Sequence, residues 1–216
     1  FIVLAAILNL YTNDVVIKRG DSTIIPEIGM TILDYDTIIS NGDSRAEILY
    51  SDSSILYIDE NTRIVTSGVE ERSVFISIGK VWAKIKKLIK GESFEVNNPL
   101  SVSGVMGTEL EVSYINDESE IKVLEGKVST RDKRTGREVI LEREKAVKIR
   151  KNMEMEVREF KLKELKRWYE WKKDHLEFLL RKIEEALSQG RTMQASRLIS
   201  QGSILAGRLN LIEEYK

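Results

Sequence analysis

The sequence predicts a mainly β protein that ends in an α-helical hairpin. In residues 15–150, short runs rich in Ile, Val, Tyr and Thr alternate with polar residues and stop at Gly, Asn, Asp and Ser. From about residue 157, apolar residues recur at three- and four-residue spacing, as they do along one face of a helix. The many short runs favour a short-stranded, solenoid-like or sandwich-like β-domain, because no stretch has the strand–helix–strand pattern of a doubly wound fold.

The chain opens with an almost purely apolar run, from Phe1 to Leu10. This run is too short to span a bilayer, which takes about 20 apolar residues. It has the length and character of a signal-peptide core, so we expect residues 1–14 to be the remnant of a signal peptide or membrane anchor. A buried first strand or helix of the core is the alternative. Export would place the protein in the periplasm or another extracytoplasmic compartment, free or membrane-anchored, with no membrane span in the mature chain.

Strand-like runs and turn signals alternate along residues 15–150, the predicted β-domain. The clearest runs are residues 46–50, 55–58, 74–78, 94–96, 110–114, 121–124 and 139–141. Clusters of turn-forming residues separate them, at residues 41–44, 52–54, 97–99, 116–119 and 135–136. Residues 82–90 depart from this pattern, because Lys-rich positions follow Trp82. They are expected to be a strand that runs into a basic loop, or a short helix.

Two apolar stripes occupy residues 151–216, the predicted helical hairpin. The first stripe consists of Phe160, Leu165, Trp168, Tyr169, Lys172, Leu176, Leu179, Ile183 and Leu187. Gly190 follows it, at the place where a helix end favours a left-handed residue. The second stripe runs from Ala195 to Ile212. The hairpin is expected to brace the β-domain or to recruit a partner.

The composition excludes several kinds of site. The chain has 34 Lys and Arg against 35 Asp and Glu, one His and no Cys. The lack of Cys excludes a disulfide framework, a Cys-based zinc site and thiol catalysis, and the single His175 excludes sites that need two histidines. The net charge of −1 gives no reason to expect nucleic acid as a partner. We therefore predict a non-catalytic protein without a cofactor or metal. A carbohydrate-acting enzyme is the less favoured alternative, because no carboxylate pair stands out by motif.

A series of short segments in the β-half occurs in a characteristic order. The segments are residues 29–38, 41–48, 52–58, 78–82, 94–99, 105–112 and 123–128. In their order and spacing they resemble the FecR-like domain family of bacterial envelope proteins, over roughly residues 15–150. Tyr35 and Ser53 stand where that family usually has glycine. The resemblance implies an all-β envelope domain rather than the complete anti-sigma regulator, and it brings no catalytic residues and no defined ligand.

Four residues of these segments are expected to have structural roles. Gly107 permits a bulge or a positive φ, and Thr108 can bond a neighbouring backbone group. Gly126 belongs to the closing segment of the resemblance. Trp82 is expected to pack between layers, where a large aromatic side chain contributes much burial.

Two charged clusters have plain structural explanations. Asp34, Asp36 and Asp43 suggest a calcium loop, but the other ligand positions of an EF-hand are absent, so these side chains are expected to bond their own turns. A basic patch consists of Lys84, Lys86, Lys87 and Lys90. It is expected to guard a strand edge against pairing, with contact to anionic envelope polymers as the alternative.

The candidate partner-binding residues are Arg167, Trp168 and Trp171. These residues cluster with Tyr169, and a helix cannot turn all three rings to one face. Packing on the β-domain and on the second helix is one explanation, and an exposed rim that contacts an envelope protein or glycan is the other. The main hypothesis is an exported, non-catalytic envelope module of the FecR-domain type that binds such a partner. A self-associating structural scaffold of the cell envelope is the alternative, and the oligomeric state stays open.

Overall fold

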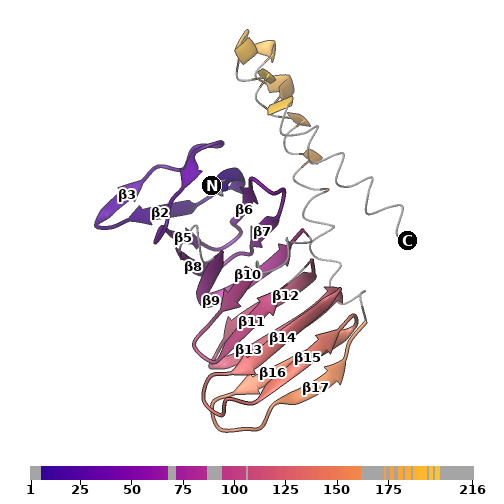
Figure 1. The fold of residues 1–216 in the computed structure, drawn as a ribbon. Coiled ribbons are helices and arrows are strands. Elements are labelled where there is room, and N and C mark those ends of the chain that lie inside the picture. Colours follow the sequence, from indigo (N-terminus) through magenta and orange to yellow (C-terminus); the bar gives the residue numbers. More distant parts are fainter. Residues whose placement is uncertain are drawn as a thin grey trace. The chain divides into compact units, whose positions relative to one another are not determined.

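The structure is a computed structural model of the 216-residue chain (Figure 1). It describes residues 6–67, 72–86, 94–105 and 107–161. It also describes residues 173, 176–177, 180–181, 183–185, 187–193, 195–196 and 198–199. The chain divides into two compact units, Phe1–Phe160 and Lys161–Lys216.

The first unit is built of short strands. Their bounds are β1 Ala6–Thr12, β2 Val15–Arg19, β3 Ser22–Ile24, β4 Thr31–Ile32, β5 Thr37–Ser40, β6 Arg45–Tyr50, β7 Ile55–Ile58, β8 Thr62–Ser67, β9 Ser73–Lys84, β10 Phe94–Asn97, β11 Ser101–Val105, β12 Glu109–Ile115, β13 Glu118–Glu125, β14 Lys127–Asp132, β15 Glu138–Glu142, β16 Lys145–Arg150 and β17 Glu156–Glu159. The predicted β class is therefore confirmed, and each of the clearest predicted runs lies within one of these strands.

The strands form two hydrogen-bonded layers that share β9. Sheet A has the order β4-β1-β6-β7-β9-β12-β13-β16-β17. Sheet B has the order β3-β2-β5-β8-β9-β10-β11-β14-β15. Nearly all pairs are antiparallel, and β9–β10 is parallel. Strand β9 is thus the central strand of both layers.

Gly79 marks the point where β9 leaves sheet B and enters sheet A. Residues 73–78 of β9 pair with β8, and residues 79–84 pair with β12. Gly79 has φ 103°, and a Cβ there would lie 2.6 Å from Thr62 Cα. Lys80 N donates to Thr62 Oγ1 at 3.0 Å. The crossing therefore needs a residue without a side chain, because the backbone of β8 occupies the place of the Cβ.

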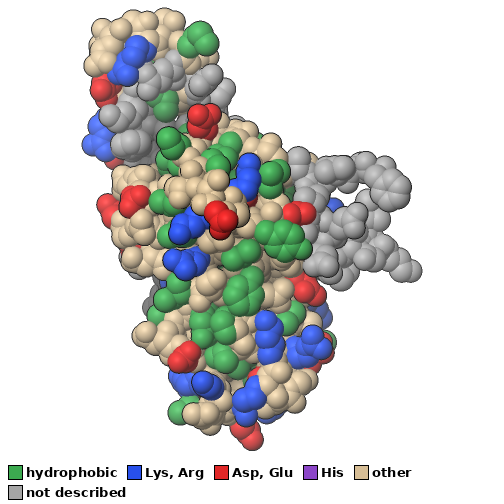
Figure 2. Space-filling model, turned by 90° about the vertical axis from the view of Figure 1, so that its left-hand side faces the viewer, with side chains coloured by type: hydrophobic (Ala, Val, Ile, Leu, Met, Phe, Trp, Pro, Cys, Tyr) green, Lys and Arg blue, Asp and Glu red, His purple; other side chains and the backbone are tan. Residues whose placement is uncertain are grey.

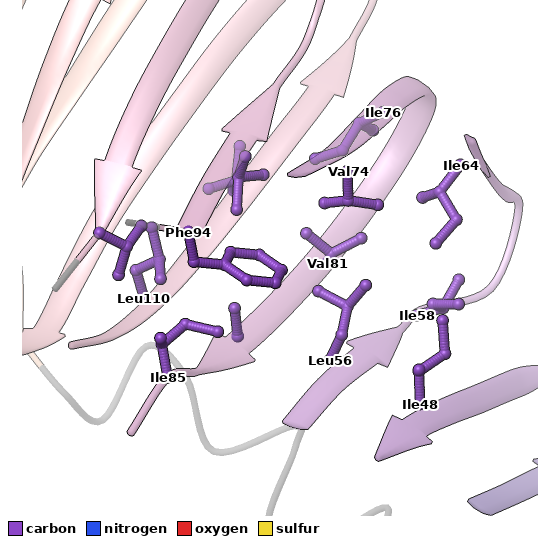
Figure 3. Packing of buried hydrophobic residues seen from close by; sticks show 14 of the residues in the cluster. Ile48, Leu56, Ile58, Ile64, Val74, Ile76, Val81, Ile85, Phe94 and Leu110 are labelled. Atoms are coloured by element: carbon purple, nitrogen blue, oxygen red, sulfur yellow. The ribbon is translucent and has the colours of Figure 1, made fainter. Parts of the chain in front are cut away.

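The hydrophobic core lies between the two layers. Side chains of successive strand residues point to opposite faces, and the inward residues of both sheets form one buried cluster. Figure 3 shows Val74 and Ile76 on one side of this core and Leu56 and Val81 on the other. The two sheets are stacked because each buries its apolar face against the other.

Apolar side chains also reach the surface. On the face drawn in Figure 2, hydrophobic side chains form a band along the molecule, and charged side chains are scattered around it. Exposed apolar surface of this kind is common, but concentrated patches mark interaction sites.

The described strands extend past both predicted ends of the β-domain, and at the N-terminal end they match the alternative of a buried first strand. Residues 1–14 were expected to be a remnant of a signal peptide or anchor, yet Ala6–Thr12 form β1, which pairs with β6, and Leu8 is fully buried. At the other end, Glu156–Glu159 form β17, which pairs with β16, so the β-domain extends to Phe160 rather than residue 150. Apolar content alone does not separate a buried strand from an exported segment, and residue spacing alone did not reveal the pairing of β17.

The second unit contains helical residues on both sides of Gly190. Described residues between 176 and 188 and between 192 and 199 are helical, and residues 189–190 form a turn. Gly190 has φ 68°, the left-handed conformation expected after a helix. The predicted helical hairpin is not confirmed, because most of its residues lie outside the described ones. Within the described part of the chain, no helix is long and apolar enough to cross a membrane.

The sheet crossing can be tested by adding one methyl group. Gly79→Ala should lower the free energy of unfolding by more than about 3 kcal/mol, because the methyl group must displace the backbone of Thr62. Gly136→Ala is the matched control, since Gly136 has φ 70° and nothing lies within 4 Å of its Cβ position. It should cost only about 1–2 kcal/mol of backbone strain. Urea denaturation measures both, and equal losses would contradict the role given to Gly79.

Candidate functional site

Four side chains lie side by side across the outer face of sheet A, the face turned away from sheet B. They are Glu47 on β6, Tyr57 on β7, Trp82 on β9 and Glu111 on β12, and each stands opposite the next in register. We call these four residues the outer row. The sequence neighbours of Trp82, Val81 and Ala83, belong to the core between the sheets. The outer row therefore occupies the other face, because strand side chains alternate.

The two aromatic rings form the centre of the outer row. The ring centroids of Tyr57 and Trp82 are 4.6 Å apart, and the ring planes are tilted by 38°. Tyr57 is fully buried and Trp82 is 5% exposed. Trp82 was expected to pack between layers, and its strand position instead directs it to the outer face of sheet A. Sheet A is thus buried on both faces along this row.

The two carboxylates of the outer row are buried and paired with nitrogen donors. Glu47 is fully buried, and its Oε1 accepts a hydrogen bond from Asn9 Nδ2 at 2.7 Å. Glu111 is 4% exposed, and Lys122 Nζ lies 3.1 Å from its Oε1. Lys80 Nζ lies 3.9 Å from Glu111 Oε2. Such partners offset part of the cost of burying a carboxylate.

A network of ion pairs continues the outer face of sheet A over β13, β16 and β17. Glu120 lies 3.2 Å from Lys122 Nζ and 2.7 Å from Arg158 Nη2. Glu118 lies 2.9 Å from Lys148 Nζ. These opposite charges lie along β13, across to the neighbouring β16, and beyond it to β17. Attraction between opposite charges on one face stabilises a sheet. The outer face of sheet A is therefore aromatic at its centre and charged toward its C-terminal strands.

The pKa values of this network favour the charged forms. The hydrogen bond from Lys148 lowers the pKa of Glu118. Burial works against ionisation of Glu120, but the hydrogen bond from Arg158 and the charge of Lys122 outweigh it and lower its pKa. Burial also works against the charge of Lys122, and attraction to Glu111 and Glu120 outweighs it and raises its pKa.

The lowered pKa values of Glu118 and Glu120 are the opposite of what a general acid needs. A general acid that works near neutral pH needs a carboxyl group with a raised pKa. Glu118 and Glu120 have lowered pKa values, so each is ionised and held by its cationic partners. Within the described ranges, no group of His, Asp and Glu side chains is arranged to hold a metal ion.

The family segments that carried the resemblance meet in space. Thr108 Oγ1 donates to the carbonyl oxygen of Lys127 at 3.0 Å, and Gly107 has φ 63°. Gly126 has φ 81°, and a Cβ there would lie 2.9 Å from the carbonyl oxygen of Gly107 and from Thr108 Oγ1. Ile85 N donates to the carbonyl oxygen of Thr108. These three motif residues thus join β12 to the turn before β14, and they support the fold rather than line a site.

The other candidates are dispersed. Asp36 is buried and paired with Arg19, while Asp34 and Asp43 are exposed. Lys84 Nζ lies 3.0 Å from Glu109 Oε2 at the sheet surface, and Lys86 is exposed. Several predicted positions lie outside the described residues, namely Lys87, Lys90, Arg167, Trp168, Tyr169, Trp171 and His175.

One feature of the sequence indicates that part of the outer row is buried. Residues 55–58 are apolar without interruption, and all four residues of β7 are buried. An uninterrupted apolar strand indicates burial on both faces. The partners Glu47 and Glu111 carry no such signal, because only the strand register places them beside Tyr57 and Trp82.

Part of the β-domain is similar to known proteins. Residues 36–129 match the family described as FecR protein. Two crystal structures of a proposed anti-sigma factor from Parabacteroides distasonis ATCC 8503, at 1.65 and 2.50 Å resolution, share the fold with a TM-score of 0.54 and 16% sequence identity. The match covers 61% of this chain and 63% of that one, which is less than two thirds of the other protein. No curated protein matches the chain.

The ion-pair network predicts a loss of stability in acid. The folded-state pKa values of Glu118 and Glu120 lie below the ordinary value of 4.5. The two carboxylates therefore contribute fully to the free energy of unfolding above that pH. This contribution is lost as the pH falls through their folded-state pKa values. Glu118→Gln/Glu120→Gln should be less stable than the wild type near neutral pH, and this difference should shrink as the pH falls below the ordinary carboxyl pKa.

Urea denaturation across this pH range measures the effect. Glu142→Gln is the control, because Glu142 also has a lowered pKa, caused by Lys127, but is fully exposed at the sheet edge. It should change the pH dependence little. A constant difference between the double variant and the wild type at all pH values would contradict the assignment.

Proposed function

Since the chain carries a FecR-family domain over residues 36–129, we propose that it is a non-catalytic regulatory module of a bacterial cell envelope that binds a protein or glycan partner. The observation that carries this proposal is the family match together with the shared fold of a proposed anti-sigma factor. Anti-sigma factors act by binding, and the likeness supports an interaction role for this β-domain. Periplasmic or other extracytoplasmic localisation is part of the same proposal.

The electrostatics of the β-domain support a binding role. Glu118 and Glu120 are held ionised by Lys148, Lys122 and Arg158, which is the state of a structural or binding network. Glu47 and Glu111 flank the tilted aromatic pair of Tyr57 and Trp82 at fixed register. Side chains held this firmly provide a rigid frame, and rigid frames lower the entropic cost of binding by the loops that they carry.

In this proposal the C-terminal part of the chain, where the sequence predicts a helical hairpin over residues 151–216, recruits the partner. The proposed contact residues are Arg167, Trp168 and Trp171, which lie outside the described residues. Trp and Arg are enriched among the residues that dominate binding energy, so the composition of this cluster supports the proposal. The repeating apolar spacing suits association with another helix as well as packing within the chain.

Self-association through the described outer edge of sheet B is disfavoured. Strand β15 pairs with β14 and is the last strand of that sheet. Antiparallel pairing of two copies of β15 about Ile140 would set Glu138 of each copy against Glu142 of the other. Like charges directly opposite one another destabilise a sheet. The binding proposal is therefore favoured over the scaffold.

Capture from envelope extracts tests the proposed function. The immobilised full chain should retain a defined partner, and the variant Arg167→Ala/Trp168→Ala/Trp171→Ala should retain at least about tenfold less of it. His175→Ala, in the same sequence region, serves as the matched control and should behave like the wild type. Circular dichroism verifies that each variant is folded. A partner retained equally by all three proteins would contradict the role of the aromatic cluster, and no retained partner would contradict the binding function.

A further inference from the structure

Tyr35 combines two features that disfavour each other. Its φ is 64°, in the left-handed region, and its side chain is 71% exposed. The left-handed conformation costs an L-residue about 1–2 kcal/mol, which a bulky side chain normally recovers through burial. An exposed ring recovers none of it. The FecR-like resemblance has glycine at this position, so the tyrosine replaces a residue that would adopt this backbone without strain.

The surrounding structure holds Tyr35 in this conformation. Asp36 is fully buried and accepts hydrogen bonds from Arg19 Nε at 2.8 Å and Arg19 Nη2 at 2.7 Å. Its Oδ2 also accepts from Leu33 N at 2.8 Å. Arg19 Nη2 donates in addition to the carbonyl oxygen of Thr31 at 3.1 Å. This bidentate pair joins the end of β2 to the turn that presents Tyr35.

Strand β8 fixes the same turn from its other side. Tyr35 N donates to the carbonyl oxygen of Thr66 at 2.7 Å, and Thr66 Oγ1 donates to the carbonyl oxygen of Leu33 at 2.7 Å. Thr66 N donates to the carbonyl oxygen of Asp36. The backbone on both sides of Tyr35 is therefore bonded, and the ring projects from a rigid turn. Strained residues held this way concentrate at functional sites.

Tyr35 belongs to a segment in which exposed apolar side chains are concentrated. Within residues 25–35, Ile25 is 82% exposed, Ile28 42% and Leu33 44%. We call residues 25–35 the display segment. It is anchored to β1, because Gly29 N donates to the carbonyl oxygen of Leu8 and Leu8 N donates to the carbonyl oxygen of Met30. Four exposed apolar side chains within eleven residues exceed the scattered exposure that a monomer normally shows.

The charged side chains within residues 20–35 are all acidic, while Lys18 is exposed on the neighbouring strand β2 and Arg19 is bound to Asp36. Asp21, Glu27 and Asp34 are exposed, and residues 20–35 contain no Lys or Arg. Asp36 is neutralised by Arg19. The display segment is thus an apolar surface with an acidic rim. A second copy of this chain would oppose the same acidic rim, so the charge favours a different partner.

We propose that the display segment is a docking surface for a partner protein segment that presents an apolar side chain beside Lys or Arg. This inference rests on the proposed binding function and names the surface and the partner's chemistry. Aliphatic Ile25, Ile28 and Leu33 favour a protein over a glycan, because sugars are recognised by hydrogen-bonding groups and aromatic faces. Tyr35 supplies the anchor, since Tyr is enriched in the centres of interfaces and the rigid turn reduces the ordering cost.

Replacing Tyr35 with glycine separates the role of the exposed ring in binding from any role in folding. Tyr35→Gly removes the ring and relieves the left-handed strain, so the melting temperature should stay equal or rise. Ser53→Gly is the matched control, because Ser53 is also exposed, has φ 67° and stands where the resemblance has glycine. Tyr35→Asn is a second variant, since Asn tolerates this backbone without offering a ring.

The probe is a displayed library of random peptides selected on the full wild-type chain. Enriched peptides should carry an apolar residue next to Lys or Arg. A synthetic consensus peptide, measured by fluorescence polarisation, should bind Tyr35→Gly and Tyr35→Asn roughly 10- to 30-fold more weakly than the wild type, and Ser53→Gly equally well. Binding should also weaken as salt is raised.

Three results would overturn the inference: no enriched peptide, enriched peptides that bind Tyr35→Gly as tightly as the wild type, or a clearly lower melting temperature for Tyr35→Gly. The last would show that the ring has a structural role. Envelope extracts separate this failure from failure of the proposed function. If wild type and Tyr35→Gly retain the same partner, the binding function stands and the display segment does not carry it. If neither retains a partner, the binding function itself fails.

Discussion

The structure depends on one strand that belongs to two sheets. Strand β9 pairs with β8 and β10 in sheet B, and beyond Gly79 it pairs with β7 and β12 in sheet A. In each sheet, four strands lie on either side of β9. The hydrogen bonding of sheet A is therefore linked to that of sheet B through β9, a strand of twelve residues. The close approach of Gly79 to Thr62 makes the crossing possible. The stacked core then follows, since both layers must bury their apolar faces against each other.

The outer faces of the two layers show how this frame relates to function. Along the outer row, sheet A buries aromatic and carboxylate side chains on the face that is turned away from the core. Toward β17 the same face becomes a network of opposite charges. At the other end of the domain, Arg19 and Asp36 fix a turn that carries an exposed tyrosine. Pairing of the strands therefore fixes the positions of the outer row, of the ion pairs and of the exposed tyrosine.

The extent to which sequence predicts this structure differs between its parts. Local patterns located the strands well, and residues 55–58 coincide with β7. They failed at the ends of the domain, because β1 and β17 are defined by their partners β6 and β16 and not by their own composition. Trp82 was assigned to the β-half correctly, but its face depends on the register of β9. The outer row could not be predicted from the sequence for the same reason. Glu47 and Glu111 come to lie in one row only through the pairing of β6, β7, β9 and β12. Tyr35 was visible as a departure from the family pattern, and only the structure showed its positive φ and its exposure.

Native-state hydrogen exchange tests most directly whether the shared strand and the display turn form one rigid frame. Amides of β9 on both sides of Gly79 should exchange with the same free energy of opening, equal to that of global unfolding. The amide of Tyr35 should approach this value, because Thr66 accepts its hydrogen bond. Different opening free energies on the two sides of Gly79, or a Tyr35 amide that exchanges as fast as an open loop, would contradict the single rigid frame.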